Sequence, residues 1–149
     1  MPIAAVNGLS LYFERAGAGE PLLFISGTGG DLRTKPNQFD GLFPKAFDMI
    51  SHDQRGLGRS DKPDVRYSMA DYADDAAALM ANQGWDSAHV VGVSFGGMVA
   101  QELALRHPGR VRRLVLACTS PGGAGGASFP FHEIEHLGDG FLFVICRYD

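Results

Sequence analysis

The stretch Val90-Val91-Gly92-Val93-Ser94-Phe95-Gly96-Gly97 decides the fold. It begins as a short apolar run, passes through the pattern G-x-S-x-G and ends in a further glycine. Residues 95–107 follow with a helical pattern that Pro108-Gly109 is expected to end. The side chains expected on the buried face of this helix are Met98, Val99, Ala100, Leu103 and Ala104. The stretch therefore predicts a strand, a sharp turn and a helix, with Ser94 at the turn.

A serine at such a turn has specific physical properties. The strand-to-helix turn holds it in a strained backbone conformation, and glycines on both sides let chain segments pass closely. Its hydroxyl is presented at the carboxyl end of the sheet, where open α/β sheets bind ligands. The N-terminus of the following helix favours developing negative charge. Two interpretations remain open: Ser94 is an exposed nucleophile, or it is a helix-capping serine in a glycine-rich turn.

Strand patterns lie on both sides of this stretch. Asn7-Gly8 is typical of a tight hairpin turn, and residues 9–13 alternate between apolar and polar side chains. Unbroken apolar runs at 22–25 and 111–118 predict strands buried on both faces, and residues 47–50 are a weaker candidate.

A second helix is predicted between these strands. Ser68 and Asp71 have the spacing of a capping box, and Gly84 is placed to end the helix. The apolar face consists of Tyr72, Ala76, Leu79 and Met80. A hairpin followed by alternating strands and helices predicts an α/β fold with a mixed, mostly parallel sheet.

A second glycine cluster, Ser26-Gly27-Thr28-Gly29-Gly30, follows the strand expected at 22–25. Such a loop can direct free backbone N–H groups at an oxyanion, or it can bind a phosphate. The cluster lacks the lysine pattern of a P-loop and the spacing of a dinucleotide-binding fingerprint.

Together these motifs resemble those of the α/β-hydrolase superfamily, specifically its small esterase, lactonase and peroxidase-like members. The resemblance covers about residues 1–130, and its motifs occur in the family's order and spacing. They are Ser26-Gly27-Thr28-Gly29, the segment 53–60 (DQRGLGRS), residues 92–97, and Arg106-His107-Pro108 leading into 111–116.

The resemblance implies a fold, an activity and site residues. It implies the N-terminal portion of an α/β-hydrolase, cleaving an ester, lactone or related acyl bond of a small molecule without a cofactor or a metal. Ser94 is then the catalytic nucleophile, and the backbone N–H groups of Thr28 and Phe95 form the oxyanion hole. Asp53 and Arg55 are expected to brace loops. Ser26 stands where the family more often has histidine, a position that mainly shapes the loop.

The chain departs from the family pattern at the general base, which is a histidine in that family. The resemblance implies the chain order serine, acid, histidine, with the histidine after a last strand that this chain does not reach. The chain is therefore expected to be truncated in or after the lid and impaired as a hydrolase. His52, His89 and His107 are expected to have structural or surface roles. The alternative is a catalytically silent fragment or binding module that self-associates through an exposed sheet edge.

The last part of the chain permits several interpretations. Residues 1–121 are predicted to be the hydrolase core, and 122–149 a glycine-rich linker with a lid remnant or a vestigial strand. If residues 140–146 resemble the family's seventh strand, Asp149 is the candidate triad acid; otherwise this tail is unrelated to the family. His132 and His136 also match H-E-x-x-H, so a zinc site is a minor alternative, with Asp139, Cys146 or Asp149 as third ligand.

Composition excludes several other classes of protein. The 149 residues fit one domain, and 13 Lys and Arg against 17 Asp and Glu give a net charge of -4. We therefore expect neither nucleic-acid nor membrane binding, and the apolar runs are too short to span a bilayer. Only two cysteines, Cys118 and Cys146, and an N-terminus without the features of a signal peptide predict a cytoplasmic protein.

Overall fold

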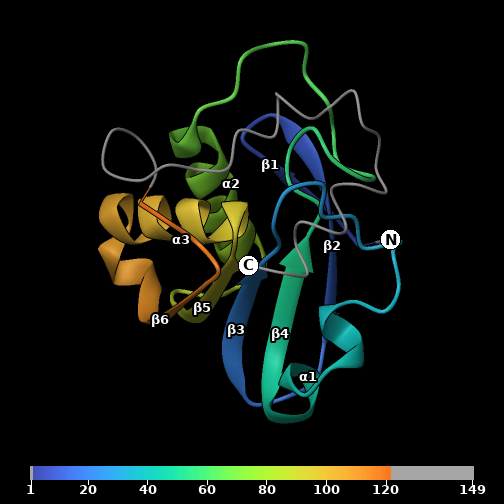
Figure 1. Cartoon of the computed structure of the whole chain (residues 1–149), viewed down its shortest axis with the longest axis vertical. Coiled ribbons are helices and arrows are strands. Elements are labelled where there is room, and N and C mark those ends of the chain that lie inside the picture. The colour runs from blue at the N-terminus through green and yellow to red at the C-terminus, as the bar shows by residue number, and fades with distance from the viewer. Residues whose placement is uncertain (1, 122–149) are drawn as a thin grey trace.

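A single mixed sheet organises the protein (Figure 1). The computed structural model describes residues 2–121. The strands of this part are β1 (Ile3–Val6), β2 (Leu9–Ala16), β3 (Glu20–Ile25), β4 (Phe47–His52), β5 (Ala88–Val93) and β6 (Val111–Ala117). They lie in the order β1-β2-β4-β3-β5-β6. Strands β4, β3, β5 and β6 run parallel to one another, which confirms the predicted α/β class.

The antiparallel part of the sheet is the N-terminal hairpin and its junction with the parallel part. Strand β1 pairs antiparallel with β2, and β2 pairs antiparallel with β4. Asn7 and Gly8 have φ values of 50° and 76°, as a two-residue hairpin turn of this kind requires. The predicted hairpin is therefore confirmed.

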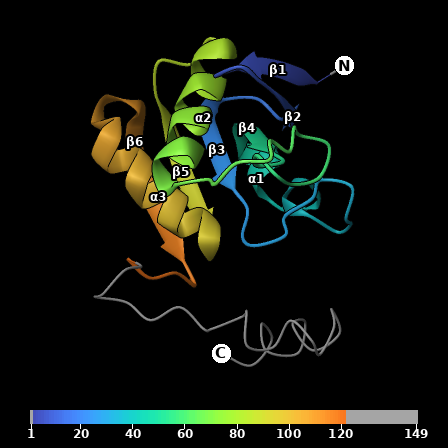
Figure 2. The same ribbon diagram turned by 90° about the horizontal axis from the view of Figure 1, so that it is seen from above.

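Helices cover both faces of the sheet unequally. The helical segments are η1 (Gln38–Asp40), α1 (Phe43–Ala46), α2 (Met69–Asn82), α3 (Phe95–Arg106) and η2 (Pro108–Arg110). Figure 2 shows α2 and α3 side by side on one face, with the short α1 on the other. None of the helices within residues 2–121 has the length and apolarity that crossing a membrane requires.

The predicted start of α2 is confirmed. The Ser68 hydroxyl accepts a hydrogen bond from the Asp71 N–H at 3.2 Å, and the Asp71 carboxylate accepts one from the Ser68 N–H at 2.7 Å. Both bonds satisfy N–H groups that the first turn of a helix leaves free. Gly84, with φ 77°, lies just beyond the last turn.

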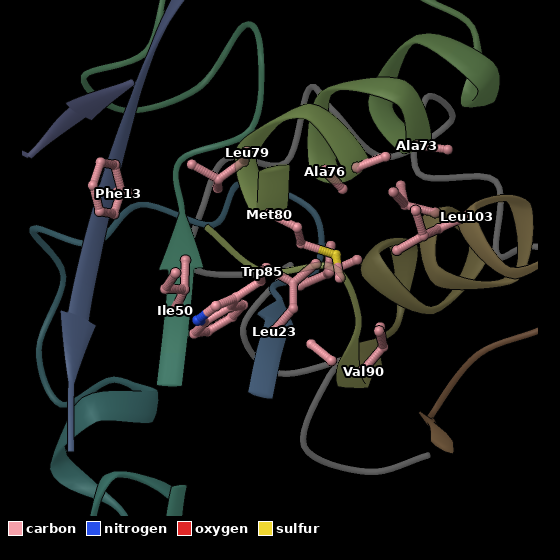
Figure 3. Close-up of a cluster of buried hydrophobic side chains, with 14 of the residues drawn as sticks. Phe13, Leu23, Ile50, Ala73, Ala76, Leu79, Met80, Trp85, Val90 and Leu103 are labelled. Carbon is pink, nitrogen blue, oxygen red and sulfur yellow. The ribbon is translucent and has the colours of Figure 1, made fainter. Parts of the chain in front are cut away.

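The main core lies between the sheet and the pair α2 and α3 (Figure 3). Leu23 and Val90 from the strands meet Leu79 and Met80 of α2 and Leu103 of α3, all of them fully buried. A smaller cluster around Leu22, Met49 and Val91 lies on the opposite face under α1. The side chains that alternate along β3 therefore enter two different cores.

Two side chains of α3 are less buried than predicted. Val99, Ala100 and Leu103 are buried, but Met98 and Ala104 are only half-buried. Successive residues of a helix are about 100° apart, which places Met98 almost opposite the buried stripe and Ala104 at its margin.

Strand β6 is exposed, where its apolar run predicts burial on both faces. Leu114, Val115 and Leu116 are 36%, 54% and 42% exposed. The reason is topological: within residues 2–121, β6 pairs with β5 on one side only and forms an edge of the sheet. Its side chains therefore lack the neighbours that a central strand would have.

Candidate active site

Ser94 lies at the turn between β5 and α3, as predicted. Its backbone has φ 54° and ψ -122°, a conformation that side chains other than glycine rarely adopt and that costs roughly 1–3 kcal/mol. Its side chain makes no capping hydrogen bond to α3. A capping serine has an extended backbone and accepts from the first turn, so this geometry contradicts the capping interpretation.

Hydrogen bonds hold the turn on both sides of Ser94. The Ser94 N–H donates to the carbonyl of Ala117 at the end of β6 at 2.9 Å. The Ser94 carbonyl accepts from the Gly97 N–H at 2.8 Å and from the Thr119 hydroxyl at 2.7 Å. The strained conformation is therefore fixed by contacts outside the residue itself.

The glycines around Ser94 are required by close packing. A Cβ atom added to Gly92 would lie 2.5 Å from the Gly96 carbonyl oxygen and 2.7 Å from the Ala100 Cβ. A Cβ atom added to Gly96 would overlap the carbonyl group of Ile25 in β3. The first glycine lets the helix approach the strand that precedes it, and the second lets it approach the neighbouring strand.

The glycine-rich loop 26–30 lies directly against Ser94. A Cβ atom added to Gly27 would lie 3.2 Å from the Ser94 Cβ and 3.7 Å from its Oγ. The Gly30 N–H donates to the Gly27 carbonyl at 3.1 Å, which closes a turn around Thr28 and Gly29. The structure thus brings together the two glycine clusters, which are more than sixty residues apart in the sequence.

The first amides of α3 are the second possible source of oxyanion donors. The Gly97 and Met98 N–H groups donate to the Ser94 carbonyl, which leaves those of Phe95 and Gly96 without a partner inside the helix. The Phe95 ring packs edge-on against Tyr72, with ring centroids 5.1 Å apart. This contact fixes the side chain of the residue whose N–H is the predicted donor.

The loop after β4 braces its neighbours, as predicted for Asp53 and Arg55. The buried Asp53 carboxylate accepts from the Leu32 N–H and the Arg59 N–H, both at 2.8 Å. Arg55 donates to both carboxylate oxygens of Asp75, at 2.6 and 2.8 Å. These bonds connect the loop to the chain after β3 and to helix α2.

Comparison with known protein families identifies the family to which this fold and site belong. The family model described as alpha/beta hydrolase fold matches residues 20–143. The chain belongs to the α/β-hydrolase fold family.

Several relatives of this α/β-hydrolase are named as hydrolases. The chain is 37% identical over 130 residues to 2-hydroxymuconate semialdehyde hydrolase of Pseudomonas sp. strain CF600, covering 85% of this chain and 44% of that protein. Its structure resembles the enol-lactonase of Burkholderia xenovorans LB400, with TM-score 0.74 and 31% identity over 80% of this chain and 47% of the other. It also resembles a meta-cleavage product hydrolase of Pseudomonas fluorescens IP01, with TM-score 0.70 and 27% identity over 86% and 46% of the two chains. The chain therefore spans less than half the length of these relatives.

Three histidines of this α/β-hydrolase lie in the described part, and each has a setting of its own. His52 ends β4 and is buried, and this burial lowers its pKa from 6.5 to about 4. His89 lies 2.7 Å from a Glu20 carboxylate oxygen, and His107 lies 2.7 Å from one of Asp74. Within residues 2–121, no histidine hydrogen-bonds Ser94.

A small depression adjoins the glycine-rich loop. Its volume is about 230 Å³, and its lining includes Ser26, Gly29 and Gly30 of the loop together with Asn37 and Gln38. This is slightly below the ~300 Å³ at which typical ligand pockets begin. Ser94 does not line it, so the depression flanks the candidate nucleophile and does not enclose it.

The remaining predicted site residues lie outside the described residues. These are Asp149, the candidate acid, and His132 and His136, the candidate zinc ligands. The predicted linker and lid remnant, residues 122–149, also lies outside the described residues, so the domain boundary stays a prediction. Within residues 2–121, no group of three or more His, Cys, Asp or Glu side chains could hold a metal ion.

Sequence reasoning missed two residues that shape the site. Gln54 donates from its side-chain amide to the Ser26 carbonyl at 2.9 Å, and Asp75 is the buried partner of Arg55. Gln54 lies inside the recognised motif 53–60, and Asp75 lies on the buried side of α2. The signal for Asp75 was a charged residue at a helix position where its neighbours along the apolar face are buried.

Proposed function

We propose that this protein is a serine hydrolase that cleaves an ester, lactone or related acyl bond of a small molecule through an acyl-enzyme on Ser94. The observation that supports it most is the strained Ser94 backbone, with a side chain that makes no capping bond at the carboxyl end of β5. Its Oγ would attack the carbonyl carbon and lose its proton to a base, and the bond to the alcohol would break as the alcohol takes up a proton. Water would then release the acid and restore Ser94.

The oxyanion hole in this proposal consists of the N–H groups of Thr28 and Phe95. The contact between Gly27 and Ser94 supports the first donor, because it places the loop next to the reacting oxygen. The free first amides of α3 support the second. Removing one such donor typically lowers kcat by about 10²–10³-fold.

The general base of this proposal is not found within residues 2–121. A serine hydroxyl is a weak nucleophile without a base, and His52, His89 and His107 are engaged or buried elsewhere. We therefore propose that the 149-residue polypeptide by itself is a weak hydrolase, with Asp149 as the candidate acid. Removing the base and acid of such triads leaves only residual catalysis.

Labelling with a fluorophosphonate, which phosphonylates activated serines, tests the proposal. We expect slow but stoichiometric labelling of the folded polypeptide at Ser94, identified by mass spectrometry of the modified peptide. Ser94→Ala should abolish it. Ser87→Ala is the matched control, since Ser87 accepts a hydrogen bond from Arg112 at the opposite end of β5, and it should label like the wild type. Absence of labelling in folded wild-type protein would refute an activated Ser94.

A second candidate is a catalytically silent domain that acts by binding. The exposed apolar residues of β6 favour it, because a strand edge that is unpaired within residues 2–121 and carries Leu114, Val115 and Leu116 can pair with another chain. In this proposal the partner is a second copy of the chain. A folded protein that self-associates but never labels at Ser94 would support this function over hydrolysis.

The zinc alternative and the location of the protein are tested separately. A zinc site at His132 and His136 would retain about one zinc per chain after treatment with a chelator, and metal analysis would measure it.

A cytoplasmic location without nucleic-acid or membrane partners is proposed from the net charge of -4 and the low cysteine content. Fractionation of cells that produce the protein would test it.

A further inference from the structure

The loop that contains the proposed oxyanion donor, the Thr28 N–H, is held by a hydrogen bond at each end. At its start, the Gln54 side-chain amide donates to the Ser26 carbonyl at 2.9 Å. Just beyond its end, the Leu32 N–H donates to the Asp53 carboxylate at 2.8 Å. Two consecutive residues after β4 thus hold the segment between them, in which the glycine-rich loop passes Ser94.

Both of these side chains are rigidly held. Asp53 is fully buried and Gln54 is 2% exposed. The Asp53 N–H donates to the Tyr12 carbonyl at 2.9 Å, and its carbonyl accepts from the Ser60 hydroxyl at 2.5 Å. The loop after β4 is therefore attached to the sheet, so it provides a fixed support for the loop after β3.

The Gln54 amide can take only one orientation. The Ser26 carbonyl is an acceptor, so the NH₂ end of Gln54 must face it. This leaves the buried Gln54 Oε1 without a hydrogen-bond partner within the described residues. An unpaired buried acceptor lowers stability and offsets the gain from the bond to Ser26. Gln54 is therefore poorly explained as a stabilising residue, but it is well placed to fix the Ser26 peptide group.

We infer that Gln54 is a positioning residue for the oxyanion hole, acting through the Ser26 carbonyl. This inference rests on the proposed function of Ser94. The bond fixes the peptide group between Ser26 and Gly27, and with it the direction in which the Thr28 N–H points toward the oxygen bound at Ser94. A displacement of about 1 Å at such a site can lower the rate about 10²-fold. Asp53 anchors the other end of the same segment.

Gln54→Met tests the inference, with Gln83→Met as the matched control. Methionine has nearly the same length and removes the unpaired amide oxygen, but it also takes the donor away from the Ser26 carbonyl. These two effects on stability oppose each other, so we expect the melting temperature to stay close to that of the wild type. Gln83 lies at the end of α2, and its side-chain amide donates to the neighbouring Asn82, so the control makes the same chemical change away from the site.

Two measurements are made on both variants. Amide hydrogen exchange of the peptide containing residues 26–30 should become at least tenfold faster in Gln54→Met and stay unchanged in Gln83→Met. Fluorophosphonate kinetics should show the maximal labelling rate at Ser94 falling by about tenfold or more, with the half-saturating probe concentration unchanged. A donor that acts only on the transition state changes the rate and not the affinity, whereas a general loss of structure changes both.

The outcomes separate this inference from the proposed function. If the wild type labels at Ser94 and Gln54→Met labels equally fast, the positioning role is refuted while the nucleophile stands. If the wild type does not label, the nucleophile is refuted, and hydrogen exchange still decides whether Gln54 holds the loop. Unchanged exchange in residues 26–30 overturns the inference in either case.

Discussion

At the scale of single residues, Ser94 combines a functional side chain with an unfavourable backbone. Its positive φ is maintained by the Ala117 carbonyl, the Gly97 amide and the Thr119 hydroxyl, not by any preference of serine. Stability and reactivity therefore make opposite demands at this position. Substitutions that remove the hydroxyl can be chosen either to keep the strain or to release it.

Ser94→Gly and Ser94→Ala should differ in stability although both lack the hydroxyl. Glycine adopts φ 54° without a steric penalty, whereas alanine retains the strain. We expect Ser94→Gly to have the larger free energy of unfolding by about 1 kcal/mol, as measured by urea denaturation. Equal stabilities, or a more stable alanine variant, would mean that the turn relaxes in solution.

His52 should make the protein less stable in mildly acidic solution. Burial lowers the pKa of His52 from 6.5 to about 4, so between these pH values the unfolded chain binds a proton that the folded chain does not. The free energy of unfolding should therefore be highest above pH 6.5 and fall by about 3 kcal/mol as the pH decreases to 4. The buried, unpaired Nδ1 of His52 has no acceptor for a second proton within the described residues.

Urea denaturation at a series of pH values would measure this loss. Carboxylates such as Asp71 and Asp74 have lowered pKa values because of their hydrogen bonds, to Ser68 and to Arg106 respectively. They stabilise the protein above their usual pKa of 3.8, and this stability is lost only at lower pH. A free energy of unfolding that stays constant from pH 7 to 4.5 would contradict the assignment to His52.

At the scale of elements, neighbouring carboxylates of α2 form ion pairs of very different kinds. Asp75 is 1% exposed, and it accepts from Arg55 and from Asn7 in the hairpin turn. Asp74 is partly exposed. It pairs with Arg106, the last residue of α3, and with His107, which follows it. The first contact links the hairpin, the helix and the loop after β4, whereas the second bridges two helices at the surface.

Asp75→Ala should destabilise the protein far more than Asp74→Ala. Removing Asp75 takes away both close hydrogen bonds of the buried Arg55 guanidinium and leaves it only the longer contact to Asp71 at 3.5 Å. Breaking a buried ion pair in this way costs about 3–5 kcal/mol. Removing Asp74 exposes its partners to water, which solvates them, so only a small loss is expected. Thermal and urea unfolding of both variants would compare them, and similar losses would show that the Arg55 pair is not desolvated in solution.

The sequence predicted those elements whose signals are local. The capping box of Ser68 and Asp71, the Asn7-Gly8 turn and the strand–serine–helix pattern around Ser94 each lie within a few residues. The contacts that join elements have no such signal. Gln54 and Ser26 are 28 residues apart, and nothing near either residue indicates that one bonds the other. The predicted burial of β6 failed for the same reason, since a strand's place in the sheet depends on partners elsewhere in the chain.

At the scale of the whole molecule, the two edges of the sheet formed by residues 2–121 differ in composition. Strand β1 is a short edge of four residues, whereas β6 is longer and exposes Val115 and Leu116. Arg112 and Arg113 protect only the first part of β6. Association between copies should therefore begin at the second half of this strand.

Val115→Lys should reduce self-association, and Leu105→Lys should not. Val115 is 54% exposed on the β6 edge, whereas Leu105 is 78% exposed on helix α3, which offers no backbone edge for strand pairing. Lysine on an edge strand disfavours pairing with another chain. Sedimentation velocity over a range of concentrations would measure the effect. If both variants associate equally with the wild type, or if Leu105→Lys is the more monomeric, the interface lies elsewhere.

The position of β4 in the sheet also limits the order in which strands can pair during translation. Strands β2 and β3 are consecutive in the chain but do not pair, because β4 lies between them and joins the two. In a nascent polypeptide leaving the ribosome, β1 and β2 can pair with each other, but β3 cannot join them in the sheet until His52, the last residue of β4, has emerged. Strands β5 and β6 lie outward from β3 in the order in which they are translated, so the turn that holds Ser94 can join the sheet by pairing with a strand that was made before it.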